Sequence, residues 1–175
     1  MSDLADLLER FRRGAELLAV GTTGVAGAEL DHKPEGHTLS IRQMVCHLAD
    51  TEAVTVMRLR HVIAEDCPVL PNFDGEAWAV KLDYARRKLS QPLETCRRLR
   101  TENYELLKDL PAETFLRTGV HSKDGVLTLR QLVELGAAHL EEHVREIQTI
   151  RAAYREHRAR MAAQAASAPA APPAS

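Results

Sequence analysis

Apolar residues recur at helical spacing in four long segments of this 175-residue chain, and this pattern constrains the fold more than any other feature. In the first segment they lie three or four positions apart: Leu4, Leu7, Leu8, Phe11, Ala15 and Leu18. Such a stripe is typical of an amphipathic helix that buries one face. The same kind of pattern predicts helices over about residues 40–65, 90–111 and 128–154. Four helices without a sustained strand pattern indicate an all-α bundle.

Local signals predict where several of these helices begin. Ser40-Ile-Arg-Gln43 and Thr128-Leu-Arg-Gln131 each have the form of a capping box. In that motif the hydroxyl accepts a hydrogen bond from the backbone amide three residues on, and the glutamine side chain reaches back to the capping residue. Asp74 is expected to cap a shorter helix in the connection that follows the second long helix.

Turn and composition signals predict one hairpin and the end of the domain. Asp124-Gly125 is a tight-turn pair, so a short β-hairpin is expected within residues 116–128. We expect residues 1–154 to form a single domain. Residues 155–175 are rich in alanine and proline, and this composition predicts a frayed helix end followed by a disordered tail.

The composition argues against several classes of protein. The 23 basic and 25 acidic side chains nearly cancel, which argues against nucleic acid as a partner, and the 45% apolar content is not that of a disordered chain. No apolar run approaches the roughly 20 residues of a membrane span, and the acidic start is unlike a secretory signal. We therefore expect a cytoplasmic protein that does not bind membranes. Three cysteines without CxxC spacing, Cys46, Cys67 and Cys96, indicate reduced and mostly packed thiols.

Three of the eight histidines lie on helix faces that are expected to meet. His139 and His143 are four residues apart, so on a helix they project from one face, one turn apart. His143 lies about 40° and His139 about 80° from the centre of the apolar stripe of their helix, in or beside its buried face. His47 lies about 100° from the centre of its own stripe, so it faces sideways towards a neighbouring helix.

Three neutral imidazoles from two helices can form a metal site that leaves coordination positions open, which is typical of a working rather than a structural metal. The ligand type does not separate zinc, nickel, iron and manganese, and availability favours zinc. The competing interpretation is a set of core histidines satisfied by backbone or carboxylate partners.

The segments that carry these histidines resemble the DinB/YfiT-like superfamily of metal-binding four-helix bundles. The similarity rests on residues 39–52 (LSIRQMVCHLADTE) and 125–133 (GVLTLRQLV), followed by His139-Leu-Glu-Glu-His143, and it spans roughly residues 4–154. It implies an up-down-down-up bundle and a divalent metal held by the same three histidines, with water completing the shell. Members with known activity join bacillithiol or mycothiol to electrophiles or are mycothiol-dependent isomerases, and many others have no assigned reaction.

Two reactions are compatible with such a site. The favoured prediction is a thiol S-transferase, in which the metal holds a low-molecular-weight thiol as thiolate for attack on a small electrophile. The alternative is a hydrolase that uses metal-bound water and a carboxylate base. Asp50, three residues after His47, is a candidate for that base or for a partner that orients an imidazole, and an exposed carboxylate is the simpler interpretation. A non-catalytic stress-response binding or scaffold bundle is the third hypothesis.

Several other residues have expectations attached to them. Glu52 lies near the centre of an apolar stripe, so it should pair with a buried arginine, either Arg97 or Arg100. Cys46 points about 100° away from the adjacent histidine and is expected to be a packed thiol rather than a ligand. His121 is expected to be a solvent-exposed loop residue, with the rim of the site as the alternative. The apolar faces of the bundle are compatible with a homodimer.

Overall fold

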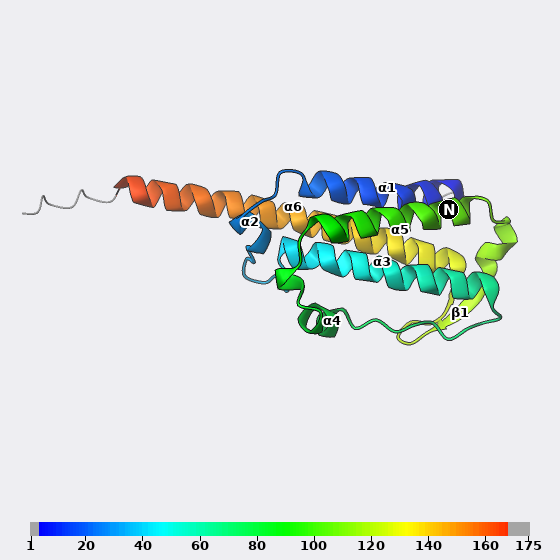
Figure 1. Ribbon diagram of the computed structural model, residues 1–175. Coiled ribbons are helices and arrows are strands. Elements are labelled where there is room, and N and C mark those ends of the chain that lie inside the picture. The colour runs from blue at the N-terminus through cyan, green and yellow to red at the C-terminus, as the bar shows by residue number, and fades with distance from the viewer. Residues whose placement is uncertain (1–3, 168–175) are drawn as a thin grey trace, which may run out of the picture.

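The computed structural model describes residues 4–167, and four long helices pack side by side in it (Figure 1). They are α1 (Leu4–Thr22), α3 (Ile41–Ala64), α5 (Ser90–Lys108) and α6 (Leu129–Ser167). α1 and α6 run in one direction and α3 and α5 in the other. α1 packs against α5 and α6, and α3 packs against the same two helices. The predicted all-α, up-down-down-up bundle is thereby confirmed.

Both predicted capping boxes are formed. The hydroxyl of Ser40 accepts from the amide of Gln43 at 3.4 Å, and the side-chain oxygen of Gln43 accepts from the amide of Ser40 at 3.0 Å. Thr128 and Gln131 make the same two bonds at 3.1 and 2.8 Å before α6. These bonds satisfy amides that a helix start leaves without intrahelical partners. The two helices that carry the candidate ligands therefore begin at positions set by local chemistry.

Short elements fill the connections between the long helices. They are α2 (Ala28–Asp31), α4 (Gly75–Lys81) and the 3₁₀ helices η1 (Tyr84–Arg86) and η2 (Ala112–Leu116). Asp74 caps α4 as predicted, because its Oδ1 accepts from the amide of Ala77 at 3.0 Å.

The predicted hairpin lies between η2 and α6. Strands β1 (Thr118–His121) and β2 (Gly125–Thr128) pair antiparallel, with His121 opposite Gly125. Gly125 has a φ of +73°, a value that favours glycine at the turn. Val120 also bridges Val69, so the segment between α3 and α4 is tied to the hairpin.

A buried ion pair joins all four long helices at the centre of the bundle. Arg100 on α5 donates to Oε2 of Glu52 on α3 through Nε at 3.0 Å and Nη2 at 2.7 Å. It also donates to the carbonyls of Phe11 on α1 and Gly136 on α6, both at 3.0 Å. Apolar clusters fill the bundle on both sides of this pair. Of the two predicted partners of Glu52, the structure selects Arg100.

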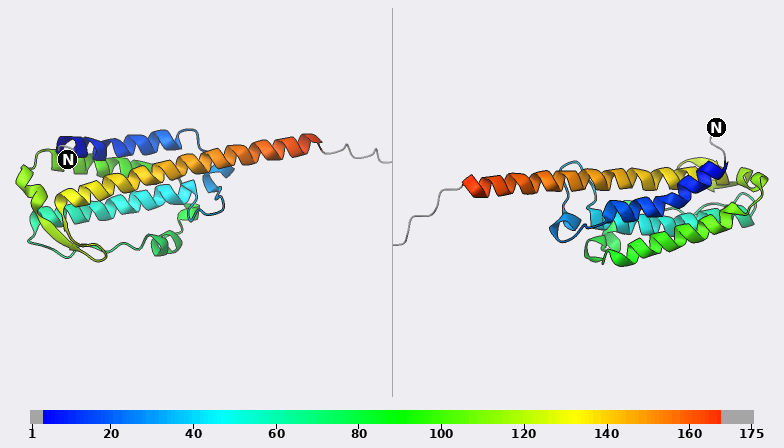
Figure 2. Two further views of the ribbon diagram at one scale, coloured as in Figure 1. Left: turned by 180° about the vertical axis from the view of Figure 1, so that it is seen from behind. Right: turned by 90° about the horizontal axis from the view of Figure 1, so that it is seen from above.

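α6 is longer than the sequence analysis predicts. A regular helix is expected to about Tyr154, followed by a frayed helix end and a disordered tail, whereas α6 continues to Ser167 and projects beyond the bundle (Figure 2). Alanine is the strongest helix former, and this stretch contains neither glycine nor proline. The remainder of the predicted tail lies outside the described residues.

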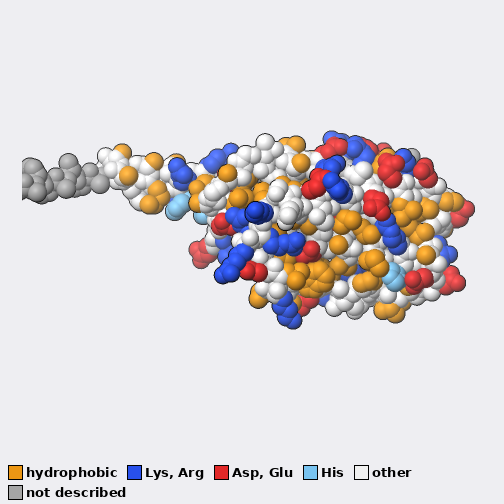
Figure 3. All heavy atoms as spheres, in the orientation of Figure 1, with side chains coloured by type: hydrophobic (Ala, Val, Ile, Leu, Met, Phe, Trp, Pro, Cys, Tyr) orange, Lys and Arg blue, Asp and Glu red, His pale blue; other side chains and the backbone are white. Residues whose placement is uncertain are grey.

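No helix within residues 4–167 is both long enough and apolar enough to cross a bilayer. On the face seen in Figure 3, acidic and basic side chains are intermingled around apolar ones.

Candidate metal centre

Three imidazoles meet between α3 and α6. His47 lies on α3, and His139 and His143 lie one turn apart on the antiparallel α6. Nε2 of His139 is 3.3 Å from Nε2 of His47 and 3.1 Å from Nε2 of His143. One ring nitrogen from each lies within 4.8 Å of the other two, the only such group of histidine, cysteine or acidic side chains found within residues 4–167. The structure thus brings together the three histidines that the sequence singled out.

The hydrogen-bond chemistry of this cluster fits a cation. Nδ1 of His143 lies 2.7 Å from Oε2 of Glu146, and because an ionised carboxylate only accepts, Nδ1 must carry the proton. A neutral His143 then presents a lone pair at Nε2 towards the other two rings. A metal with bonds of about 2.1 Å to nitrogen separates its ligand atoms by about 3.4 Å in tetrahedral and about 3.0 Å in octahedral geometry. The two measured separations fall in this interval, so the donor set fits one divalent ion.

Burial keeps two of these imidazoles neutral. Loss of solvation lowers the pKa of His47 to about 4 and the pKa of His139 to about 3, and the charge of neighbouring imidazoles adds to the effect. The neutral imidazole is the form that binds metals. Both rings therefore have a lone pair ready at neutral pH.

The ring of His47 is held by packing against the segment that leads into α4. Phe73 lies against it with ring centroids 5.4 Å apart, and Trp78 packs edge-on against Phe73 at 5.0 Å. A Cβ at Gly75 would lie 2.7 Å from Cε1 of His47 and 3.0 Å from Nδ1, so glycine permits this close approach. Nδ1 of His47 is buried and has no hydrogen-bond partner. The Nδ1 side of this ring is therefore held by packing rather than by a hydrogen bond.

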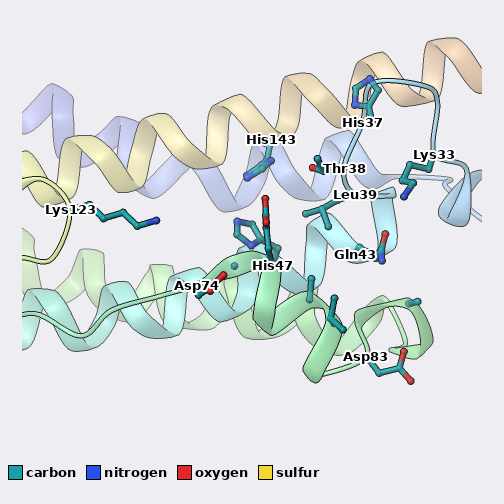
Figure 4. A pocket seen from close by; sticks show the side chains of 15 residues that line it. Lys33, His37, Thr38, Leu39, Gln43, His47, Asp74, Asp83, Lys123 and His143 are labelled. Atoms are coloured by element: carbon teal, nitrogen blue, oxygen red, sulfur yellow. The ribbon is translucent and has the colours of Figure 1, made fainter.

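Two cavities reach the histidine cluster. The larger, of 1190 Å³, is lined by His47 and His143, whose rings point towards one another in Figure 4. The smaller, of 260 Å³, is lined by His139. Lys123, in the turn of the hairpin, borders both cavities and extends towards the cluster in Figure 4. A small molecule therefore has room to approach the ring nitrogens.

Asp50 belongs to a different network. Its carboxylate accepts a hydrogen bond of 2.5 Å from the hydroxyl of Tyr84 and lies 3.6 Å from Nη1 of Arg87. Burial, together with this hydrogen bond, raises the pKa of the Tyr84 phenol. The expectation that Asp50 orients an imidazole does not match this placement, because tertiary contacts direct it to the connection between α4 and α5. Glu146 makes that contact instead.

Two of the three cysteines are packed thiols, as expected. Cys46 and Cys96 are buried, whereas Cys67 is exposed.

His121 is not the exposed loop residue that the sequence suggests. Its side chain is 12% exposed, its Nδ1 lies 2.8 Å from Oδ2 of Asp124, and it lines the smaller cavity. The hairpin brings His121 to the wall of this cavity.

Three residues near the site were missed by the sequence analysis. Glu146 lies three residues after His143, a spacing that places it on the same helix face and that was visible in the sequence. Gly75 and Glu76 lie in a connection whose position no periodic pattern predicts. The tertiary structure places both in the wall of the larger cavity.

Comparison with known proteins agrees with this architecture. The family model described as the DinB superfamily matches residues 7–147. A Halalkalibacterium halodurans protein is 26% identical over 127 residues, covering 73% of this chain and 74% of that protein. An Oceanobacillus iheyensis protein is 27% identical over 122 residues, covering 70% of each chain. Both relatives carry names that describe them as candidate metal-dependent hydrolases.

A solved structure shares the fold. YfiT from Bacillus subtilis superposes with a TM-score of 0.77 at 22% identity, covering 83% of this chain and 84% of that one. It is described as a probable metal-dependent hydrolase with an unusual four-helix bundle topology. The likeness establishes a common fold for the two chains.

Proposed function

Because this chain belongs to the DinB superfamily and gathers three imidazoles at one point, we propose that it is a metal-dependent hydrolase of a small-molecule amide or ester. His47, His139 and His143 hold the ion. The convergence of their Nε2 atoms, with separations of 3.1 and 3.3 Å, carries the proposal. The names of the two relatives support the type of reaction.

The bound ion and the protein side chains have different roles at such a site. A bound divalent ion supplies Lewis-acid chemistry, which polarises a carbonyl group and lowers the pKa of water. Three protein ligands leave room for substrate and solvent. Glu146 holds the proton on Nδ1 of His143 and so directs Nε2 of that ring into the cluster.

Glu76 is the best-placed candidate for a general base. It lines the same cavity as His47 and His143, and it forms no ion pair with a described residue. Asp74 lines that cavity too, but its carboxylate caps α4. General bases contribute about 100-fold to 10,000-fold, so Glu76→Gln should lower turnover at least about 100-fold and leave the metal content unchanged. Equal turnover of the variant and the parent protein would remove Glu76 from this role.

Elemental analysis tests metal binding directly. The purified protein should carry about one ion per chain, with zinc favoured by availability. His139→Ala and His143→Ala should each lose the ion with only a modest loss of helicity. His37→Ala is the matched control, because His37 lines the larger cavity but lies outside the cluster. A protein that holds no metal and takes up none of zinc, nickel, iron or manganese would refute the proposal.

A thiol S-transferase is the second candidate. Two observations favour it: the cluster contains no carboxylate, and the 1190 Å³ cavity has room for bacillithiol or mycothiol beside an electrophile. In that reaction a sulfur–carbon bond forms as a leaving group departs from the electrophilic carbon. Turnover that requires an added thiol would favour the transferase, and cleavage of esters or amides in buffer alone would favour the hydrolase. A metal-loaded protein active in neither assay would favour a binding or scaffold role.

A further inference from the structure

Arg58 is a partly buried cation in the wall of the smaller cavity. Its Nε donates to the carbonyl of Pro71 at 3.0 Å, and it forms no ion pair with any residue of the described chain. Every other arginine within residues 4–167 that is at least partly buried does form one. Loss of solvation lowers the pKa of Arg58, and the charge of Asp124, with which it forms no ion pair, opposes this effect.

Lys123 is the second cation at this cavity. It forms no ion pair with a described residue, and Figure 4 shows it extending towards the histidines. The acidic residue in the same wall is Asp124, whose Oδ2 lies 2.8 Å from Nδ1 of His121. The cavity wall therefore contains two cations, Arg58 and Lys123, and one carboxylate that already contacts His121, and a bound metal would add further positive charge.

Both polar and apolar side chains line the wall of the smaller cavity between Arg58 and the histidine cluster. Thr51, Thr55 and Arg58 follow His47 by 4, 8 and 11 residues, which places all of them on one face of α3. Apolar side chains complete the wall: Phe73, Leu132 and Leu135. Eleven residues rise about 16 Å along a helix, and an arginine side chain leans back towards the N-terminus. A ligand several bonds long would therefore span this distance.

We propose that the smaller cavity selects substrates that carry a carboxylate, which binds between Arg58 and Lys123 while the bond to be cleaved lies at the histidine cluster. The inference rests on the proposed function, because that function places the reaction at the cluster. A guanidinium binds a carboxylate through two parallel hydrogen bonds. The volume of 260 Å³ is below the roughly 300–1,000 Å³ of sites for drug-sized ligands, so the cavity suits a short-chain acid.

Binding of hexanoate to the metal-free protein tests this inference without catalysis. Treatment of the protein with a chelator ensures that the carboxylate cannot bind directly to a metal. Binding is followed by nuclear magnetic resonance titration, through the backbone amides of Thr51, Thr55 and Gly136. Hexanamide is the neutral isostere, and it should bind at least 10-fold more weakly than hexanoate. Equal affinity for the two probes, or no saturable binding of hexanoate, would overturn the proposal.

Substitutions separate charge from structure. Arg58→Gln should weaken hexanoate binding at least 10-fold and leave hexanamide unchanged, and Lys123→Gln should weaken it about threefold. Arg58→Lys keeps the charge but not the paired hydrogen bonds, so it should lose clearly less affinity for hexanoate than Arg58→Gln. Lys33→Gln, in the larger cavity, is the matched control and should have no effect. Equal losses in Arg58→Lys and Arg58→Gln would indicate a structural role through Pro71 and would overturn the proposal.

The outcomes for the two proposals are distinguishable. If hexanoate binding depends on Arg58 but the protein takes up no metal, the carboxylate site stands and the proposed hydrolase fails. If the metal-loaded protein cleaves neutral esters and binds no carboxylate in the smaller cavity, the hydrolase stands and this inference fails.

Discussion

Removing the guanidinium of Arg100 should destabilise the bundle more than any surface substitution. Arg100→Met deletes four hydrogen bonds to three helices and leaves Glu52, whose side chain is 3% exposed, without its counter-ion. Removing one partner of a buried ion pair costs about 3–5 kcal/mol, because the other charge stays buried and uncompensated. With a urea dependence of about 2 kcal/mol per molar, the unfolding midpoint should fall by about 2 M.

Urea unfolding followed by circular dichroism measures this loss, with chelator present so that metal binding does not contribute. Arg97→Met is the matched control, since Arg97 pairs on the surface with Glu94 and should cost less than about 1 kcal/mol. The double variant Glu52→Leu/Arg100→Met should regain at least half of the loss, because it leaves no buried charge. A midpoint shift below about 0.5 M for Arg100→Met would refute the reasoning, as would a double variant less stable than that single one.

Three further predictions concern glycines and thiols. Gly14→Ala should lower the free energy of unfolding by about 1–3 kcal/mol in urea titrations, because its Cβ would lie 2.7 Å from Nη1 of Arg100. Gly21→Ala is the control and should be neutral or stabilising, because the nearest atom to its Cβ would be 3.5 Å away. Gly75→Ala should weaken zinc binding about 10-fold to 100-fold in a chelator competition, because the new methyl group displaces a ligand ring, and unchanged affinity would contradict this. At pH 8 a disulfide reagent should label Cys67 rapidly, and Cys46 and Cys96 only after unfolding. Both of these thiols are buried, and burial raises the pKa of Cys46 and raises that of Cys96 to about 12.

The sequence by itself determined the long helices, the starts of two of them, the hairpin and the histidine pair. Each of these depends on residues close together in the chain. A capping box needs only Ser40 and Gln43, and the spacing of His139 and His143 places them on one face of any helix that contains them. The extension of α6 to Ser167 also has a local cause, because alanine favours helix.

Only the tertiary structure decided which side chains from different helices meet. Local periodicity leaves Arg97 and Arg100 as alternative partners of Glu52, and the packing of α5 against α3 selects the second. Asp50 is close to His47 in sequence, but contact with Tyr84 holds its carboxylate in another network. Helical periodicity determines which residues share a face, whereas the neighbour of that face depends on how distant segments pack.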